Sequence, residues 1–373
     1  MNLNFNVPGV LIDPMPSGSN QDPMPSVTNE PMPSSSNSAE PADSVPSGLL
    51  AQALISHRSA VVRASDDKAR AQTRGNSSAT AIWQWASSVR VNAIAREVLG
   101  NLRFEHGAYW LMPAMDASGG LAQRAAKLLF LKAPGATKLQ AQLDLVLDAA
   151  DERPDRMAEI LIQARSLWPF WTAVSHVVPG QAPRTAELMA VAQAIAGHMG
   201  HQFKHVLAVP RPTDLSPAVQ PCITTPGHGA MPSGHAISAF MALRMLKALL
   251  PNSRIGGVDT VGVSLDRTAR RIAANRVVAG LHFPLDNCAG WCVAETAFEI
   301  VSMMAGHVTN PPPIRGFDAA ATAVTALPTD DLPLNDSSVG SHVEASQAAV
   351  VSSPLLTLLW GAAEAELTRL QLN

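Results

Sequence analysis

Residues 275–286 read NRVVAGLHFPLD, a pattern that predicts two helices meeting at a short junction. Arg276 belongs to an apolar helical segment, Gly280 is a residue type that ends helices, and a proline after the junction suits the first turn of the next helix. His282 therefore lies at the junction, and Asp286 is placed to accept from one ring nitrogen and orient the imidazole. A buried histidine beside a capping aspartate is the alternative interpretation.

A second stretch, residues 231–240 (MPSGHAISAF), predicts a helix start, because proline and serine precede an apolar periodic run. The backbone N–H groups and the positive end of the helix dipole at Ser233 and Gly234 then favour an oxyanion. His235 lies at the mouth of such a site, within reach for proton transfer. An ordinary capped helix with a surface histidine accounts for the same residues.

A third stretch, residues 204–212 (KHVLAVPRP), places two cations in a mostly apolar segment. Lys204 and Arg211 are seven residues apart, so they point to the same side if a helix persists over these two turns. Cations in apolar surroundings normally need an anionic partner, whereas a solvated helix face is the simpler alternative. His228, in the loop before His235, either belongs to the same site or is a loop histidine at its entrance.

Helical periodicity extends over most of the chain and predicts an all-α fold, a helical bundle. Ser78 is the predicted cap of the first long helix, and Gly100 is its predicted stop. The helices are expected near residues 78–99, 120–132, 137–150, 155–177, 184–208, 233–250, 258–280 and 285–305.

Four segments follow from this pattern. Residues 1–47 contain nine prolines and three Pro-Met-Pro-Ser repeats, and we expect a disordered tail. Residues 48–305 form the predicted helical domain, which contains all three stretches within 204–286. Residues 306–342 are expected to be a loop or flexible segment. Residues 343–373 are expected to form a C-terminal helix that packs on the bundle or mediates a homo-oligomer.

The formal charge of −3 is unevenly distributed along the chain. Residues 58–315 carry 26 bases and 18 acids, a net charge of +8, whereas both ends are acidic. A basic middle favours an anionic ligand. No nucleotide-binding glycine loop and no basic stripe with interleaved aromatics is present, so we expect no nucleic-acid partner.

Membrane and export signals are not visible in the sequence. No apolar run reaches the roughly 18–20 residues of a transmembrane span, and no basic segment followed by an apolar one marks a secretory signal. Cys222, Cys288 and Cys292 form neither a disulfide framework nor a metal-ligand set, and the last two are expected to be small core residues. We therefore expect a soluble, reduced, cytoplasmic protein.

Taken in order, the patterns Lys-x6-Arg-Pro, Pro-Ser-Gly-His and Arg-x5-His-x3-Asp fall within 83 residues. Together they resemble the three-part signature of the type 2 phosphatidic acid phosphatase (PAP2) and vanadium-dependent haloperoxidase superfamily. One position departs from the usual pattern, because Asn275 stands where the family usually has serine. The resemblance implies an all-helical enzyme whose single pocket holds either a phosphate ester or vanadate.

The resemblance also implies a role for each residue. Three cations, the Ser233 hydroxyl and the Gly234 N–H would bind the oxygens of the anion, an arrangement of the oxyanion-hole type. His282 would be the nucleophile toward phosphorus or the axial ligand of vanadium, with Asp286 orienting it, and His235 would be the general acid and base. The three cations of this implied site are Lys204, Arg211 and Arg276.

Three functions are compatible with these expectations. The first is a vanadate-dependent, haloperoxidase-like oxidation of halide by hydrogen peroxide. It is favoured by His228, which precedes His235 by seven residues, a position where haloperoxidases resembling the bromide-oxidising type also carry histidine. The alternative is a PAP2-type phosphatase without a cofactor, which hydrolyses phosphomonoesters or diphosphates through a phosphohistidine. The third is a non-catalytic anion-binding or scaffold protein.

Overall fold

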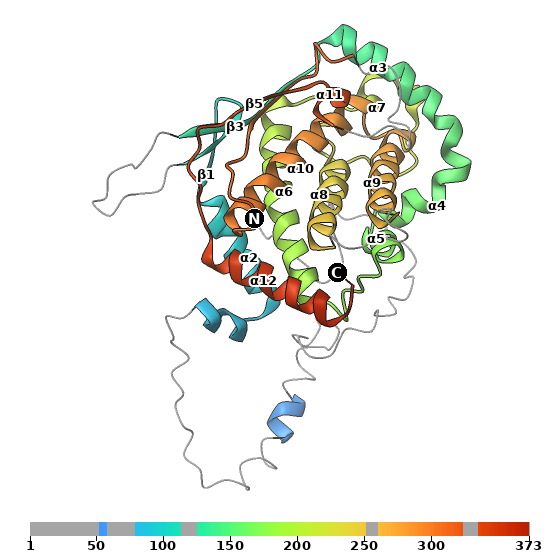
Figure 1. The fold of residues 1–373 in the computed structure, drawn as a ribbon. Helices are drawn as coiled ribbons and strands as arrows, with labels where there is room; N and C mark the ends of the chain where they lie inside the picture. Colours follow the sequence, from blue (N-terminus) through green and yellow to red (C-terminus); the bar gives the residue numbers. More distant parts are fainter. Residues whose placement is uncertain (1–51, 58–78, 113–124, 251–259, 324–334, 373) are drawn as a thin grey trace, which may run out of the picture.

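The computed structural model describes residues 52–57, 79–112, 125–250, 260–323 and 335–372. The predicted disordered tail at 1–47 and the predicted cap Ser78 lie outside these residues. Helices dominate the described part of the chain and form one bundle (Figure 1). The predicted helical fold class is therefore confirmed.

Four long helices form the core: α6 (Pro183–Leu207), α8 (Gly234–Leu249), α9 (Thr260–Val278) and α10 (Pro284–Met304). α8 packs against the other three. α10 is apolar around nearly its whole circumference, the pattern of a helix with no solvent-facing side, and it is buried along almost its full length. Within the described residues, none of the helices combines the length and hydropathy needed to cross a bilayer.

Shorter helices surround this core. α2 (Ser87–Leu99) and α12 (Pro354–Arg369) pack on α6, while α3 (Ala136–Ala149), α4 (Arg153–Gln163) and α5 (Trp168–Ser175) pack on α9. The shortest elements are η1 (Ala79–Gln84), η2 (Ala150–Glu152), α7 (Pro212–Leu215), η3 (Pro217–Val219) and α11 (Asp336–Val339).

Two buried carboxylates attach the surrounding helices to α6. Glu187 accepts from the Arg90 guanidinium of α2 at 2.6 and 2.7 Å. Glu366 of α12 accepts from the backbone N–H of Thr185 at 2.8 Å, so it caps the start of α6. Each contact satisfies groups that would otherwise be buried without a partner.

A five-stranded sheet was not expected from the sequence. Its strands are β1 (Leu102–Glu105), β2 (Ala108–Leu111), β3 (Ala126–Lys132), β4 (Ile314–Asp318) and β5 (Ser341–Glu344), in that spatial order. All neighbours are antiparallel except β3 and β4. In Figure 1 the sheet lies on the opposite side of the bundle from α3 and α4, and β3 and β4 pack on α10.

The helix predicted at 120–132 is wrong where the structure describes it, because residues 126–132 form strand β3. The sequence there is a short apolar run between lysines, which fits a strand as well as a helix. β1 and β2 form a hairpin whose turn, His106 and Gly107, has positive φ at both positions, as the tight primed turns require.

Most predicted helices are confirmed within a few residues, namely those now numbered α3, α6, α8, α9 and α10. The segment predicted as one helix at 155–177 is two, because the chain breaks between α4 and α5. The first long helix begins as η1, continues as α2 and ends before Gly100, the predicted stop. The C-terminal helix is shorter than 343–373, because β5 precedes it, and the segment 306–342 contains β4 and α11.

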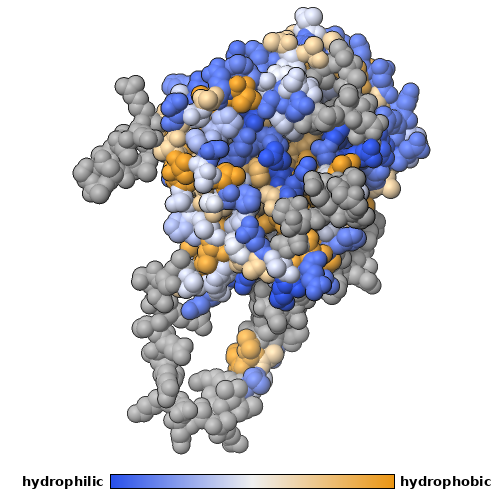
Figure 2. All heavy atoms as spheres, in the orientation of Figure 1, coloured by the Kyte–Doolittle hydropathy of each residue, from blue (hydrophilic) through white to orange (hydrophobic). Residues whose placement is uncertain are grey.

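Hydrophilic residues predominate on the face seen in Figure 2, and apolar ones are scattered there in small groups. Most apolar side chains of the four core helices are instead buried, with Val206 of α6 and Val263 of α9 as exposed exceptions. Burial of apolar surface at this scale is the main force that holds a helical bundle together.

Candidate active site

The structure brings the three sequence stretches together between the ends of the four core helices. They contribute from the end of α6 and the loop after it, the start of α8, the end of α9 and the start of α10. The side chains concerned are at most 3% exposed, which is rare for charged groups. They are Lys204, Arg211, Ser233, Arg276, His282 and Asp286.

Lys204 and Arg211 do not share a helix face. α6 ends at Leu207, and Ala208 adopts a left-handed conformation with φ of 45°, so the chain leaves the helix before Pro210. Arg211 is extended and starts α7 instead. The Lys204 ammonium donates to the Gly229 carbonyl oxygen at 3.2 Å, which joins the end of α6 to the loop before α8.

The Arg211 guanidinium links two histidines. Its Nη1 donates to the Leu281 carbonyl oxygen at 2.9 Å and lies 3.3 Å from His282 Nε2. Its Nε donates to the His228 carbonyl oxygen at 3.1 Å, and its Nη2 lies 3.1 Å from His228 Nδ1. The His201 ring of α6 meets the His228 ring edge to face at 5.8 Å between centroids. His228 therefore lies against one of the proposed anion-binding cations.

The His282 ring is oriented from both sides. Its Nδ1 lies 3.2 Å from Asp286 Oδ2, which also accepts from the Phe283 N–H at 2.8 Å. Since Asp286 accepts at Nδ1 and Arg211 donates at Nε2, the contacts assign the neutral tautomer with its proton on Nδ1. The Nε2 lone pair then faces the Arg211 guanidinium.

Burial raises the pKa of Asp286 to about 7. The Phe283 N–H and the positive charges of Lys204 and Arg211 act in the opposite direction on this pKa. Both cations therefore influence the carboxylate that holds His282, which is consistent with a single electrostatic site.

Two glycines permit the close approaches around this site. Gly280 has φ of +79°, and a Cβ there would lie 2.9 Å from Val219 Cγ1. A Cβ at Gly290 of α10 would lie 2.8 Å from Ala236 Cβ and 2.9 Å from the Ser233 carbonyl oxygen at the start of α8. Glycine at both positions keeps the junction and the two helix starts in contact.

The start of α8 has the geometry of a capped helix. The Ser233 hydroxyl accepts from the Ala236 N–H at 3.4 Å, and the Ser233 N–H donates to the Asp286 carbonyl oxygen at 2.9 Å. Gly234 is the first helical residue, as the sequence predicts. The positive end of the α8 dipole therefore lies beside the first turn of α10, which carries Asp286.

Gln163, the last residue of α4, contacts two residues of the signature. Its side-chain Oε1 accepts from Arg276 Nη2 at 3.0 Å, and its carbonyl oxygen lies 3.2 Å from His235 Nε2. Sequence reasoning missed this residue, which precedes the first motif by about forty positions and belongs to no motif. The available signal was a polar residue on the buried face of α4, which it shares with Ile160.

Asn275, the position that departs from the family pattern, belongs to the same contact. Its Nδ2 donates to Gln163 Oε1 at 3.0 Å and to Glu159 Oε2 at 2.8 Å. Its Oδ1 accepts from Arg156 Nη1 at 3.2 Å. The longer amide therefore connects α9 to α4, a contact that the shorter serine side chain could not span in the same way.

The cysteines lie as expected for core residues. Cys288 and Cys292 of α10 are buried and free, and burial raises the pKa of the Cys288 thiol to about 12. Across the described ranges, no group of three or more His, Cys, Asp or Glu side chains is arranged to hold a metal ion. A site in which one histidine is the only protein ligand, as expected for His282, does not need such a group.

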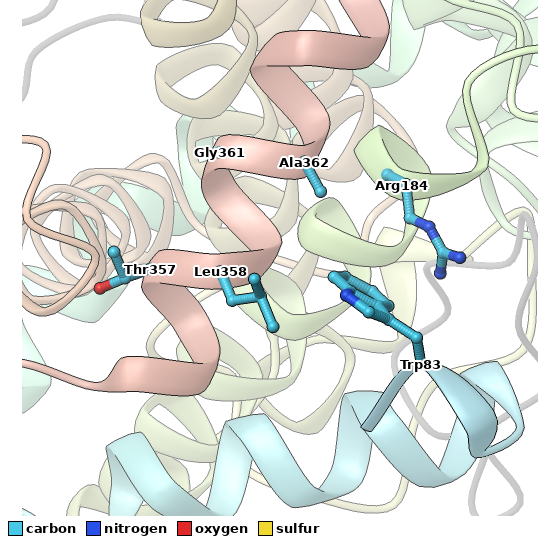
Figure 3. A pocket seen from close by; sticks show the side chains of 6 residues that line it. All are labelled: Trp83, Arg184, Thr357, Leu358, Gly361 and Ala362. Atoms are coloured by element: carbon cyan, nitrogen blue, oxygen red, sulfur yellow. The ribbon is translucent and has the colours of Figure 1, made fainter. Parts of the chain in front are cut away.

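A surface pocket lies elsewhere on the molecule, between η1, the start of α6 and α12 (Figure 3). The Arg184 guanidinium stacks over the Trp83 ring at 4.3 Å, and Gly361 and Ala362 of α12 form the opposite wall. None of its lining residues belongs to the three sequence stretches. The pocket is therefore distinct from the candidate active site.

The structure is a helical bundle that buries three cations, a helix start and a histidine held by a carboxylate near the ends of its core helices. Residues 186–306 match the model of the PAP2 superfamily, a range that contains most of α6, all of α8, α9 and α10, and all three motifs. This part of the chain is therefore a PAP2 superfamily domain, and the superfamily comprises phosphatase-like and haloperoxidase-like enzymes. No curated protein matches the sequence significantly.

Proposed function

We propose that the protein is a vanadate-dependent, haloperoxidase-like enzyme that oxidises halide with hydrogen peroxide. The observation that supports this best is the contact of His228 with Arg211, at 3.1 Å between Nδ1 and Nη2. The same Nδ1 also lies 3.1 Å from the Gly229 carbonyl oxygen, so this ring nitrogen meets both a donor and an acceptor. A second imidazole beside an anion-binding guanidinium provides a proton donor that hydrolysis of a phosphate ester does not require.

The residues present fit vanadate. Three cations buried in an apolar bundle complement the negative charge of an oxyanion. Lys204, Arg211 and Arg276 would hold its oxygens, and His282 Nε2, whose lone pair faces Arg211, would be the protein ligand. When bound, vanadate supplies the activation of peroxide toward halide.

The chain's own residues then have separate tasks. The three cations and the α8 N-terminus stabilise negative charge on oxygen in a site protected from water. Asp286 keeps the proton on His282 Nδ1, so that Nε2 remains a lone-pair donor. His235, at the start of α8, and His228, beside Arg211, hold and transfer protons to and from the oxygen species.

A phosphatase remains the second candidate because of the same His282 tautomer. A Nε2 lone pair beside a guanidinium is the state that attack on phosphorus requires. In that reaction a P–N bond forms while the P–O ester bond breaks, and the departing alkoxide takes a proton from His235. Water then attacks phosphorus as the P–N bond breaks, and His235 takes a proton from the water, which returns inorganic phosphate, neutral His282 and protonated His235.

One preparation of the full chain separates the two functions. We expect bromination of a dye with bromide and peroxide that depends on added vanadate and is lost in His282→Ala. His205→Ala, which changes an exposed histidine of α6, is the matched control and keeps the activity. Hydrolysis of a phosphomonoester by the same preparation, inhibited by vanadate and without bromination, would overturn the proposal in favour of the phosphatase.

A further inference from the structure

The amide of Gln163 is buried next to Arg276, and its orientation is fixed by its neighbours. Arg276 has only donors, so the atom 3.0 Å from its Nη2 is the Gln163 oxygen. The second group on that oxygen is Asn275 Nδ2, identified as a donor because it also faces the Glu159 carboxylate at 2.8 Å. Reversing the Gln163 amide would place its NH2 group against two donors.

The other half of this amide is a buried donor. Gln163 is 1% exposed, and its Nε2 has no hydrogen-bond partner within the part of the chain that the structure describes. Native proteins rarely leave such a group without an acceptor, since its desolvation is then uncompensated. A ligand oxygen beside Arg276 would supply the acceptor.

We propose that Gln163 Nε2 donates a hydrogen bond to an oxygen of the oxyanion that Arg276 binds. Gln163 is then a binding residue from α4, outside the three motifs, and it adds a donor without adding charge. The inference rests on the proposed function only in that the pocket takes a tetrahedral oxyanion. It applies equally to vanadate and to phosphate.

Gln163 could also act on anion binding indirectly, because its Oε1 positions Arg276. A double-mutant cycle distinguishes this positioning role from direct hydrogen bonding to the anion. If Gln163 acted only through Arg276, Gln163→Met would have no effect on anion binding once Arg276 is already Met. A direct donor still contributes in that background.

The test is the equilibrium dissociation constant for vanadate and for inorganic phosphate, measured by calorimetry on the full chain. We expect Gln163→Met to weaken both by about tenfold or more, the effect of one hydrogen bond to a charged group, and to weaken them again in the Arg276→Met background. Gln140→Met, an exposed glutamine of α3, is the matched control and leaves both constants unchanged. Unchanged binding in Gln163→Met, or an effect confined to the chain that retains Arg276, overturns the inference.

A measurement on the unmutated chain covers the case in which Gln163→Met does not fold. With glutamine labelled by nitrogen-15, saturation with phosphate is expected to shift one buried side-chain amide, the resonance that is missing from Gln163→Glu. No shifted glutamine amide at saturation overturns the inference. Because both experiments measure binding, loss of the haloperoxidase assay with binding intact defeats the proposed function alone, whereas a chain that binds neither anion defeats both.

Discussion

Asp286 holds the His282 ring beside the first turn of α10. Its Oδ2 accepts from both the His282 ring and the Phe283 N–H, so the ring, the junction and the first turn of α10 are held by one atom. Residues that orient a ligand in this way typically contribute as much as a direct contact. Its influence on the proposed site can therefore be tested without changing the three buried cations.

Replacing Asp286 by Asn should weaken vanadate binding by roughly 10- to 100-fold, the usual effect of removing a group that orients a ligand. The Asn oxygen can take the place of Oδ2 and still accept from both the Phe283 N–H and His282 Nδ1. The neutral amide lacks the negative charge of the carboxylate, however, so it favours a proton on Nδ1 less strongly. Calorimetric titration with vanadate checks this. Asp144→Asn on the exposed side of α3 serves as the control, and wild-type affinity in Asp286→Asn would show that the carboxylate does not orient the ring.

Much of this site was predictable residue by residue because its information is local. His282 and Asp286 are one helical turn apart, and the α8 start is marked by serine before an apolar run. Gln163 was not predictable, since its role depends on α4 packing beside α9, a tertiary contact. The strands were missed because β1 and β2 have only four residues each, too few to establish a period, and β3 is a short apolar run that suits either state.

At the scale of elements, α4 is the helix that connects the bundle to the site. Its first residue, Arg153, donates to the Val278 carbonyl oxygen at the end of α9 at 2.9 Å, and to the carbonyl oxygens of Val219 and Gln220. Its last residue, Gln163, contacts Arg276. α4 thus fixes the end of α9, where the junction to His282 begins.

Arg153→Met should lower the free energy of unfolding by about 2 kcal/mol, because three carbonyl oxygens lose hydrogen bonds to a charged donor. Urea denaturation followed by circular dichroism measures this. Arg103→Met removes only an ion pair between exposed side chains and should change the same free energy by about 0.5 kcal/mol or less. Equal effects of the two variants would contradict the role given to α4.

At the scale of the whole molecule, the segment that follows α10 returns to lie beside β3, a strand that precedes α6 in the sequence. β4 pairs in parallel with β3, and Arg315 of β4 binds Glu299 of α10 at 2.8 Å. Glu295, one turn earlier, pairs with Arg244 of α8. These charged contacts connect the sheet, α8 and α10. The free energy of unfolding is therefore expected to depend on the protonation state of the buried carboxylates.

Glu295 makes that dependence measurable, because burial raises its pKa to about 7, with the Arg244 charge opposing the shift. The folded protein therefore binds more protons than the unfolded chain between about pH 4.5 and 7, and the contribution of Glu295 to stability is lost as the pH rises through this window. Relative to Glu295→Gln, the wild type should lose roughly 2–3 kcal/mol between pH 5 and 8. Parallel stability curves for the two proteins in urea would contradict the shift.

The positively charged residues 58–315 include three buried cations, Lys204, Arg211 and Arg276, which lie near the ends of α6 and α9. The central claim is that they form one oxyanion site. A crystal structure of the full chain with vanadate tests it most directly. We predict one anion within hydrogen-bonding distance of Lys204, Arg211 and Arg276 and next to His282 Nε2. Vanadate bound elsewhere, or no vanadate at full saturation, would contradict the account.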